Sequence, residues 1–343
     1  MHIEQFDPLT DTRLLSICHQ IMEMARPTDH PSLPPQSFDG FTAWWAHGGD
    51  RQQSWLARDD SDRPVGCYLL MLPELENTTM AECGLIVAPA RRRAGVGTAL
   101  IAHCAGQAKR AGRSKLTSTG ATRTRVRDGS PGAAFAADIG ARTGLAELIM
   151  TQDIDADLLA RLARLRADAG QRCAGYELVS WLGASLDEHI DQFARVSDAM
   201  SDAPRDAGVQ PQRWDAARIR NAEELAIGHG LRLYSMAARH RGTGDFAAVT
   251  RITTDPGTPG WGIQQLTVVQ PEHRGHRLGI LVKIAMLELL TEHDPGTRRI
   301  LTGTAGSNQH MTAINAQLGY QIKDVYRSWE LDLAARGDHP WSR

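Results

Sequence analysis

The sequence predicts an α/β protein of two similar halves, and three observations lead to this prediction. The segments 89–97 and 271–279 share a motif whose matching residues all lie 182 positions apart: Pro89 and Pro271, Arg92 and Arg274, Gly97 and Gly279. A second pair of segments, 130–140 and 308–320, repeats a short helical pattern that ends at a glycine, with a spacing of 179. Strand-like and helix-like apolar periodicities alternate in the same order in both halves.

The first half is expected to span 1–152. Its apolar runs and turn residues predict helices at 10–25, 37–47, 95–110 and 130–139, and strands at 53–58, 64–73, 78–88, 114–118 and 144–151. Val96, Leu100 and Cys104 recur at helical spacing after the strand-like run that ends at Val87. A leucine-rich amphipathic stretch within 153–171 predicts a helix that connects the halves.

The second half is expected to span 172–335, followed by a tail at 336–343. It repeats the element order, with strands at 175–182, 231–239, 244–254, 261–270, 298–303 and 320–333, and helices at 186–200, 213–228, 278–292 and 309–317. Ile280, Ile284 and Leu287 supply the helical spacing after the second strand-like run. Each half is long enough to bury a core of its own.

The amino-acid composition argues against several classes of function. The 343 residues include 38 Lys and Arg against 40 Asp and Glu, so no general basic field favours nucleic acid or an anionic membrane. The five cysteines form no CxxC pair and no Cys/His ligand spacing, so we expect no metal site and a reducing compartment. No secretory signal and no membrane-length apolar run are present. We therefore expect a cytoplasmic monomer or homodimer without nucleic-acid or membrane partners.

The first repeated motif has the features of a phosphate-binding loop. A strand ends in Val-x-Pro, then Arg-x-x-Gly-x-Gly leads into an amphipathic helix. Glycines let the backbone approach an anion, and the helix N-terminus adds roughly half a positive charge. The spacing is not that of the Rossmann dinucleotide motif, and no Walker lysine follows.

At these residues the sequence resembles the GNAT (GCN5-related) N-acetyltransferase family. Arg92-Arg-Ala-Gly95-Val-Gly97 matches the family pattern fully, whereas Arg277 replaces the first glycine in the second copy. The run from Asn308 to Tyr320 is similar to the family's second motif. The resemblance covers nearly the whole chain twice and is similar to that of actinobacterial two-domain GNATs, such as mycothiol-synthase-like enzymes.

The resemblance implies two tandem GNAT folds, each with a mixed, centrally splayed β-sheet flanked by helices. It implies direct transfer, in a ternary complex, from acetyl-CoA or another acyl-CoA to a primary amine of a small metabolite or antibiotic. The implied CoA-binding residues of the first half are Ile86, Val87, Arg92, Arg93, Ala94, Gly95, Val96, Gly97 and Thr98. Those of the second half are Val268, Val269, Arg274, Gly275, His276, Arg277, Leu278, Gly279, Ile280, Asn308 and Asn315. Arg277 has two interpretations, a solvated surface residue or a clamp on the CoA 3′-phosphate.

The candidate residues for proton transfer differ between the two halves, unlike the repeated loop motif. The family often uses a carboxylate base on the splayed strand, where the first half has Glu82 and the spacing matches it to Gln264. Asp202 lies in a loop expected on the acceptor side, and its alternative role is an Asx-turn before Pro204.

In the second motif, the spacing matches Asn308 to Gly129 and Asn315 to Ala136. Asn315 stands where the family often has a tyrosine that protonates the departing thiolate. An amide cannot supply that proton, so water, Tyr320 or Tyr234 are the alternatives. We expect the second half to be the catalytic one, because several polar groups are expected on one acceptor side there: Asn308, the strand residues Gln264, Gln265 and Thr267, and the Asp202 loop. Two other functions stay open: a non-catalytic acyl-CoA-binding or regulatory protein, and a peptide or protein N-acetyltransferase.

Overall fold

The computed structural model describes residues 1–45, 51–124, 127–170 and 172–335. Contacts divide the chain into two compact units. Unit 1 contains Met1–Glu147, Asp206–Gln210 and the C-terminal residues from Asp324, and unit 2 contains Leu148–Arg205 and Pro211–Lys323. The predicted tail at 336–343 lies outside the described residues.

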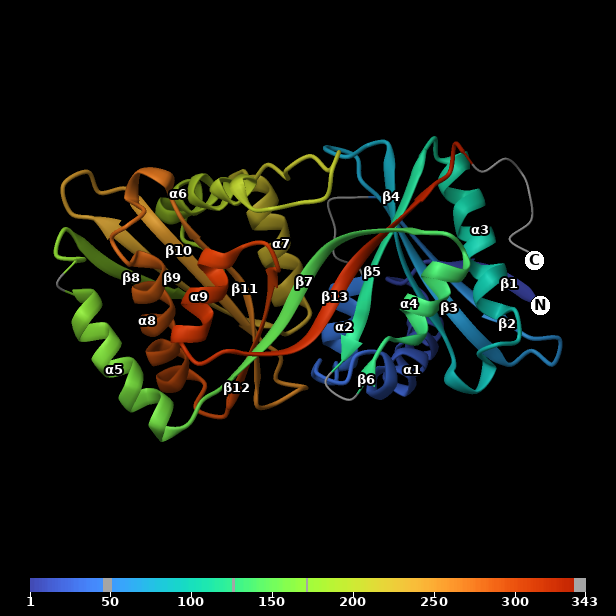
Figure 1. Cartoon of the computed structure of the whole chain (residues 1–343), viewed down its shortest axis with the longest axis horizontal. Coiled ribbons are helices and arrows are strands. Elements are labelled where there is room, and N and C mark those ends of the chain that lie inside the picture. Colours follow the sequence, from blue (N-terminus) through green and yellow to red (C-terminus); the bar gives the residue numbers. More distant parts are fainter. Residues whose placement is uncertain (46–50, 125–126, 171, 336–343) are drawn as a thin grey trace. The chain divides into compact units, whose positions relative to one another are not determined.

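Unit 1 is a twisted sheet with helices on both faces (Figure 1). Its elements are β1 (His2–Phe6), α1 (Thr12–Asp29), α2 (Phe38–Trp45), β2 (Arg51–Arg58), β3 (Pro64–Leu72), β4 (Met80–Val87), η1 (Pro89–Arg91), α3 (Val96–Arg110), β5 (Lys115–Thr124), β6 (Arg127–Asp128), α4 (Pro131–Asp138), the first half of β7 (Arg142–Asp153) and most of β13 (Gln321–Asp332). The strand order is β1-β2-β3-β4-β5-β13, and β6 pairs with β5. All these pairs are antiparallel except β4 with β5.

Unit 2 repeats this plan after the connecting helix α5 (Ala156–Gly170). Its elements are β8 (Tyr176–Leu182), α6 (Asp187–Asp198), η2 (Ala199–Asp202), α7 (Ala216–Gly228), β9 (Arg232–His240), β10 (Phe246–Thr254), β11 (Trp261–Val269), η3 (Pro271–His273), α8 (Leu278–His293), β12 (Arg299–Ala305) and α9 (Gln309–Gln317). The strand order is β8-β9-β10-β11-β12, with the end of β7 next to β12. Only β11 and β12 are parallel among the pairs with an assigned register in this unit.

Two strands do not stay with the repeat that encodes them. β13 is the last strand of the second repeat, yet its residues from Asp324 belong to unit 1, where Leu331 pairs with Leu116 of β5 (Figure 1). The end of β7, from Leu148, belongs to unit 2. The predicted boundaries, 1–152 and 172–335, do not anticipate this exchange. Strand pairing uses backbone groups that either sheet can offer, so apolar periodicity does not specify the partner.

Both sheets splay at the centre. The parallel ladder between β4 and β5 ends at Glu82 and Thr117, although β4 stays paired with β3 as far as Val87. In unit 2 the ladder between β11 and β12 ends at Ile263 and Leu301, although β11 stays paired with β10 as far as Val269. The prediction of an α/β fold with two centrally splayed mixed sheets is therefore confirmed.

The cores lie on both faces of each sheet. In unit 1, Tyr68 and Leu70 pack on the face covered by α3, whereas Cys67 and Leu69 pack on the face covered by α1 and α2. This alternation follows from the two-residue period of a strand. On β4, Cys83 therefore points towards α3, while Glu82, Gly84 and Ile86 point the other way.

Candidate active site

The two phosphate-binding loops have the same backbone conformation. Both α3 and α8 begin after a residue in the left-handed region, Gly95 (φ 80°) and Arg277 (φ 56°), and neither helix has a side-chain cap. By contrast, α1, α4, α7 and α9 each have a side-chain cap at the N-terminus. The first-turn N–H groups of α3 and α8 are therefore without a side-chain acceptor and suit an anion.

A second left-handed residue stands two positions earlier in each loop, Arg93 (φ 61°) in unit 1 and Gly275 (φ 88°) in unit 2. Each loop thus has one glycine and one arginine at its two left-handed positions, in opposite order. Arg277 adopts the conformation that a glycine takes in the first loop, so its presence does not change the loop's path. Its strained backbone costs roughly 1 kcal/mol.

The first arginine of each motif is anchored by a carboxylate. Arg92 forms a bidentate pair with Asp29 at the end of α1, with N–O distances of 3.0 and 2.7 Å, and its Nε donates to the Val87 carbonyl. Arg274 pairs with Asp202 at 2.8 Å, and its Nε donates to the Val269 carbonyl. The structure thus places Asp202 against the phosphate-binding loop of unit 2. Asp29, its counterpart in unit 1, carried no motif signal in the sequence.

Glu82 lies where β4 and β5 diverge, and its side chain is exposed on the sheet face opposite α3. The match between Glu82 and Gln264 is wrong in structural terms. A β-bulge shifts the register of β11, so Gln264 lies opposite Ile252 and takes the position of Cys83, while Ile263 takes the position of Glu82. One-dimensional spacing cannot reveal a bulge, because it adds a residue without changing the motif that follows.

The side chain of Gln264 makes its hydrogen bonds beside the bulge in β11. Its side chain is buried, and Nε2 donates to Thr250 Oγ1 at 2.8 Å, to the Arg251 carbonyl at 2.7 Å and to the Leu266 carbonyl at 2.9 Å. These contacts satisfy carbonyls that the irregular ladder leaves without a regular partner. The structure therefore gives Gln264 a structural role.

The second motif also differs from its expected alignment. Asn308 is the N-cap of α9 and accepts a hydrogen bond from the Met311 N–H. The N-cap of α4 is Ser130, one residue after the predicted match Gly129, and it accepts from the Ala133 N–H. Because α9 is one residue longer than α4, the first half does have a polar group at this position.

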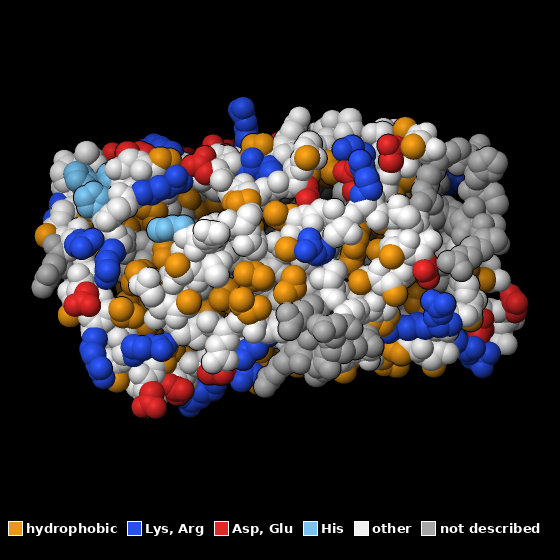
Figure 2. Space-filling model, viewed as in Figure 1, with side chains coloured by type: hydrophobic (Ala, Val, Ile, Leu, Met, Phe, Trp, Pro, Cys, Tyr) orange, Lys and Arg blue, Asp and Glu red, His pale blue; other side chains and the backbone are white. Residues whose placement is uncertain are grey.

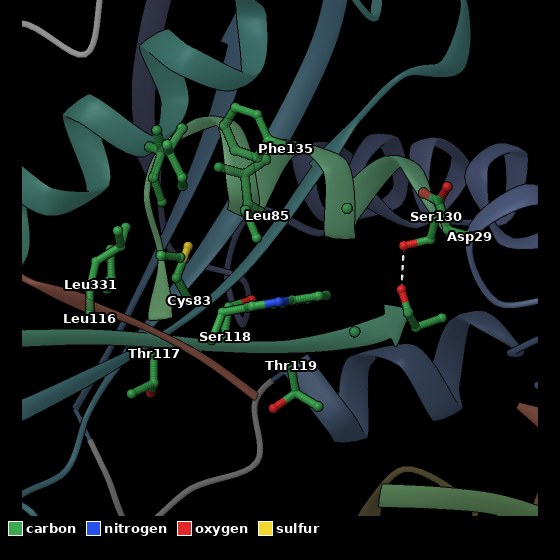
Figure 3. A pocket seen from close by; sticks show the side chains of 18 of the residues that line it. Asp29, Cys83, Leu85, Leu116, Thr117, Ser118, Thr119, Ser130, Phe135 and Leu331 are labelled. Atoms are coloured by element: carbon green, nitrogen blue, oxygen red, sulfur yellow. Dashed lines mark hydrogen bonds between the residues drawn. The ribbon is translucent and has the colours of Figure 1, made fainter. Parts of the chain in front are cut away.

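Unit 1 contains a cavity of about 140 Å³ where the sheet splays (Figure 3). Residues from β4, β5, α3, α4, β13 and the end of α1 surround it, among them Asp29, His30, Cys83, Leu85, Ile101, Leu116, Thr117, Ser118, Thr119, Ser130, Phe135, Ala136, Trp329 and Leu331. Leu116 and Leu331 lie at one end, and Ser130 and Asp29 lie at the other. The cavity thus has an apolar end and a polar end.

Polar side chains occupy the equivalent positions of unit 2. Lys283 of α8 corresponds to Ile101 of α3, and its Nζ donates to Asn315 Oδ1 at 2.9 Å. Asn315 Nδ2 donates to Thr304 Oγ1 at 3.2 Å, and the ammonium lies 4.5 Å from the Tyr320 ring centroid. Burial lowers the pKa of Lys283 to about 7. Asn315, predicted to contact CoA, is thus buried in a network with Lys283, Thr304 and Tyr320.

His30 borders the polar end of the cavity in unit 1. Its Nδ1 lies 2.6 Å from the hydroxyl oxygen of Tyr326 on β13. Burial lowers the pKa of His30, whereas burial and the nearby carboxylates of Asp324, Glu147 and Asp29 raise the pKa of Tyr326. The phenol therefore keeps its proton near neutral pH, and the two side chains form a hydrogen bond between neutral groups. Sequence spacing gave no signal for this pair, because 296 positions separate its members.

Several predicted CoA-binding side chains point into the core. Val96, Val268, Leu278, Gly279 and Ile280 are buried, so only their backbones are available to a ligand. Exposed side chains in the two loops are Arg93, Ala94, Arg274 and His276. Ile86, Val87, Gly97, Thr98 and Val269 are partly exposed.

The described residues carry two further negative findings. They hold no group of three or more His, Cys, Asp or Glu side chains placed to bind a metal ion. Their helices include none with the length and apolarity that a membrane span requires. On the face in Figure 2, acidic and basic side chains are intermixed, in keeping with the formal charge of −2.

Residues 18–127 match the model of the acetyltransferase (GNAT) family. A tandem GNAT protein from the clavulanic acid biosynthesis pathway is similar over 97% of this chain and 98% of its own, with 29% identity and a TM-score of 0.79. This chain therefore contains a GNAT acetyltransferase domain within residues 18–127. A GNAT from Sphaerobacter thermophilus shares the fold at 12% identity, with a TM-score of 0.63 over 97% of this chain and 95% of that one.

More distant GNAT-like folds also match. Saccharomyces cerevisiae N-myristoyltransferase, with bound myristoyl-CoA, has a TM-score of 0.62 at 10% identity, over 96% of this chain and 82% of that one. Among curated proteins, no sequence matches significantly. GNAT proteins bind acyl-CoA and transfer its acyl group to an acceptor, so this chain is an acyltransferase.

Proposed function

We propose that the chain transfers an acyl group from acyl-CoA to a primary amine of a small molecule, and that unit 1 contains the transfer site. The observation that carries this proposal is the cavity in the splay of β4 and β5, whose lining includes Cys83, the residue that follows Glu82 on β4. In unit 2 the corresponding positions hold Lys283 and Asn315 in a buried network, and the position of Glu82 holds Ile263. This assignment departs from the sequence-based preference for the second half.

The residues of unit 1 fit acyl-CoA. A Cβ atom added at Gly95 would meet no atom within 4 Å, so the backbone of the loop is open to a pyrophosphate. The uncapped N-terminus of α3 supplies N–H donors and a favourable dipole. At Ile86 and Val87, beyond the last ladder pair at Glu82, no pairing of β4 with β5 is assigned among the described residues, so these backbone groups are available to pantetheine amides.

Acyl-CoA, when bound, supplies an activated thioester carbonyl. Glu82 stands on the other face of the sheet from α3, where an amine can approach through the splay. Its carboxylate would bind the ammonium form of the acceptor and take one proton from it, which gives the nitrogen the lone pair that attacks the thioester carbonyl. The nitrogen gives its second proton to water as the N–C bond forms. The C–S bond breaks, and the thiolate takes a proton from water, because the pKa of a thiol is near ~8.5.

The small-molecule acceptor is supported by the relative from the clavulanic acid biosynthesis pathway, which is similar over nearly the full length of both chains. The opposing proposal is that unit 2 catalyses, with Asp202 as the acceptor-binding group. However, the Asp202 carboxylate already pairs with Arg274 of the predicted phosphate-binding loop. We therefore propose that Asp202 and Asp29 orient the loop arginines.

The experiment is a screen of an amine panel with acetyl-CoA, followed by the release of free thiol. With an accepted amine, Glu82→Gln is expected to lower kcat/KM roughly 10²- to 10⁴-fold, the range of a lost general base. The affinity for CoA should stay within about twofold, because Glu82 lies away from the phosphate-binding loop. Asp202→Asn is the control and should change kcat/KM little.

A large loss in Asp202→Asn with an unchanged Glu82→Gln enzyme would place the transfer site in unit 2. If CoA binds and no small amine or peptide N-terminus releases thiol, the non-catalytic alternative gains support. Turnover with peptides alone would favour the protein N-acetyltransferase alternative.

A further inference from the structure

The cavity of unit 1 extends beyond the path predicted for CoA itself. Neither the strand residues 86–87 nor the loop 92–98 is among the residues that surround it. Its walls come instead from Cys83 and Leu85 further back on β4, from β5, and from the inner side of α3 and α4. The space therefore lies where a group attached to the CoA sulfur would reach.

The inner end of this space is apolar. Ile101, Leu116 and Leu331 surround it and are 6%, 2% and 4% exposed, so a ligand there would contact hydrocarbon side chains. Figure 3 shows Leu116 and Leu331 side by side at this end, with Cys83 next to them. Among the polar lining residues, Asp29 and Ser130 lie at the far end, whereas Thr117, Ser118 and Thr119 follow β5 along the side of the cavity.

The comparison with unit 2 shows which side chains keep the space open. Helix alignment matches Ile101 with Lys283, and counting back from Gly140 and Gly319 matches Ala136 with Asn315. Counting from the last pairs of the parallel ladders matches Gly120 with Thr304. Ala136 and Gly120 are the smaller partners, and Ile101 has no polar end group.

We propose that unit 1 selects CoA thioesters whose acyl group is apolar and contains roughly six carbon atoms, in preference to acetyl-CoA. A cavity of roughly 150 Å³ holds a benzene molecule, and this one measures about 140 Å³, whereas an acetyl methyl group would leave most of it empty. The inference rests on the proposed function, because it assigns the acyl specificity of the same site.

The exchanged strand β13 sets the depth of the cavity. Trp329 packs over Gly120, where an added Cβ atom would lie 2.9 Å from the indole ring, and Leu331 pairs with Leu116. Both side chains surround the cavity. The second repeat therefore supplies specificity-determining residues of the first.

The test is isothermal titration calorimetry of the full chain with CoA, acetyl-CoA, butanoyl-CoA, hexanoyl-CoA and dodecanoyl-CoA, which needs no acceptor. Each buried methylene is expected to raise affinity about fourfold, so hexanoyl-CoA, with four more methylenes, should bind roughly 250-fold more tightly than acetyl-CoA. Dodecanoyl-CoA should gain nothing over hexanoyl-CoA, because the cavity is then full. A flat series, or acetyl-CoA as the tightest ligand, overturns the inference.

The binding of CoA itself separates this inference from the proposed function. If CoA does not bind at all, the proposed function fails. If CoA binds and its affinity does not depend on chain length, only the acyl specificity fails.

Ala136→Leu fills the cavity and should remove the preference for hexanoyl-CoA while affinity for CoA stays within about twofold. Ala137→Leu makes the same change on the exposed side of the same helix and is the matched control. Trp329→Leu enlarges the cavity and should move the optimum to a longer chain. Circular dichroism melts establish that each variant is folded. Folded cavity variants with the unaltered chain-length profile would also overturn the inference.

Discussion

At the residue scale, different residue types adopt the same left-handed backbone conformation in the two repeated loops. Both phosphate-binding loops have two left-handed positions, and each places its glycine at a different one. Sequence comparison alone treats Arg277 as a defect in the motif. Its positive φ shows that the loop keeps its conformation, at a small local cost.

Lys283 is the residue whose chemistry depends most on its surroundings. It is 4% exposed, its neighbours Asn315 and Tyr320 are neutral, and burial lowers its pKa from 10.5 to about 7. Between pH 7 and 10.5 the unfolded chain therefore binds a proton that the folded chain does not. Stability should rise with pH across this window, because the unfolded state binds more protons.

We expect the free energy of unfolding to rise about 1.4 kcal/mol more per pH unit in the wild type than in Lys283→Met, between pH 7.5 and 9.5. Urea unfolding at several pH values measures both slopes. Lys323→Met, at a partly exposed position of the same unit, should keep the wild-type slope. Equal slopes in the wild type and Lys283→Met would show that Lys283 keeps its proton in the folded chain.

At the element scale, the bulge in β11 is the main difference between the two splayed strands. The first repeat has a regular ladder between β3 and β4 from Gly66 to Met71, whereas β11 shifts register between Leu266 and Gln264. The buried amide of Gln264 donates to a carbonyl of each strand, Arg251 on β10 and Leu266 on β11, which form the pair next to that shift. The hydrogen bonds of the Gln264 side chain thus stabilise the bulge from within the two strands that form it.

Gln264→Met should lower the free energy of unfolding by about 1–3 kcal/mol, because it leaves buried carbonyl groups without donors. Turnover with acetyl-CoA should change less than threefold, since unit 1 performs the transfer in our proposal. Gln265→Met is the control, because its exposed side chain donates only to Thr253 Oγ1. Chemical denaturation and steady-state kinetics give the two readouts. A stable but inactive Gln264→Met enzyme would restore Gln264 as a catalytic residue.

At the scale of the whole molecule, the exchange of β7 and β13 makes each compact unit depend on both repeats. Tyr326, Leu331 and Leu333 are buried in unit 1 although the second repeat encodes them. Asp206 also belongs to unit 1 and bonds the hydroxyl of Ser328. The repeats of the sequence and the compact units of the structure are therefore different divisions of the chain.

A chain that stops after Lys323 should have a largely unfolded unit 1. Three buried side chains at about 1.5–3 kcal/mol each amount to roughly 5–9 kcal/mol, comparable with the whole stability of a domain. Circular dichroism melts and calorimetry with CoA measure the loss. A chain that stops after Ala335 keeps all of β13 and should melt and bind CoA as the wild type does. Two-state melting and intact CoA binding in the shorter chain would contradict the role of β13.

The amino-acid sequence by itself determined the features that repeat locally along the chain. Pro89, Gly97 and their counterparts specified two strand–loop–helix motifs, and the alternating periods of apolar residues specified an α/β fold. The motifs also carry the resemblance to the GNAT family, and that resemblance implies the two splayed sheets. Such signals survive in one dimension because caps, turns and periodicity depend on neighbouring residues.

Only the tertiary structure decided which residues meet across long separations. It brought Tyr326 to His30, paired Asp202 with Arg274 and moved Gln264 out of the position of Glu82. It also opened a cavity in the splay of unit 1 and placed Lys283 and Asn315 in a buried hydrogen bond at the equivalent positions of unit 2. Strand pairing and side-chain packing set these outcomes, and both depend on contacts between residues that sequence spacing does not relate.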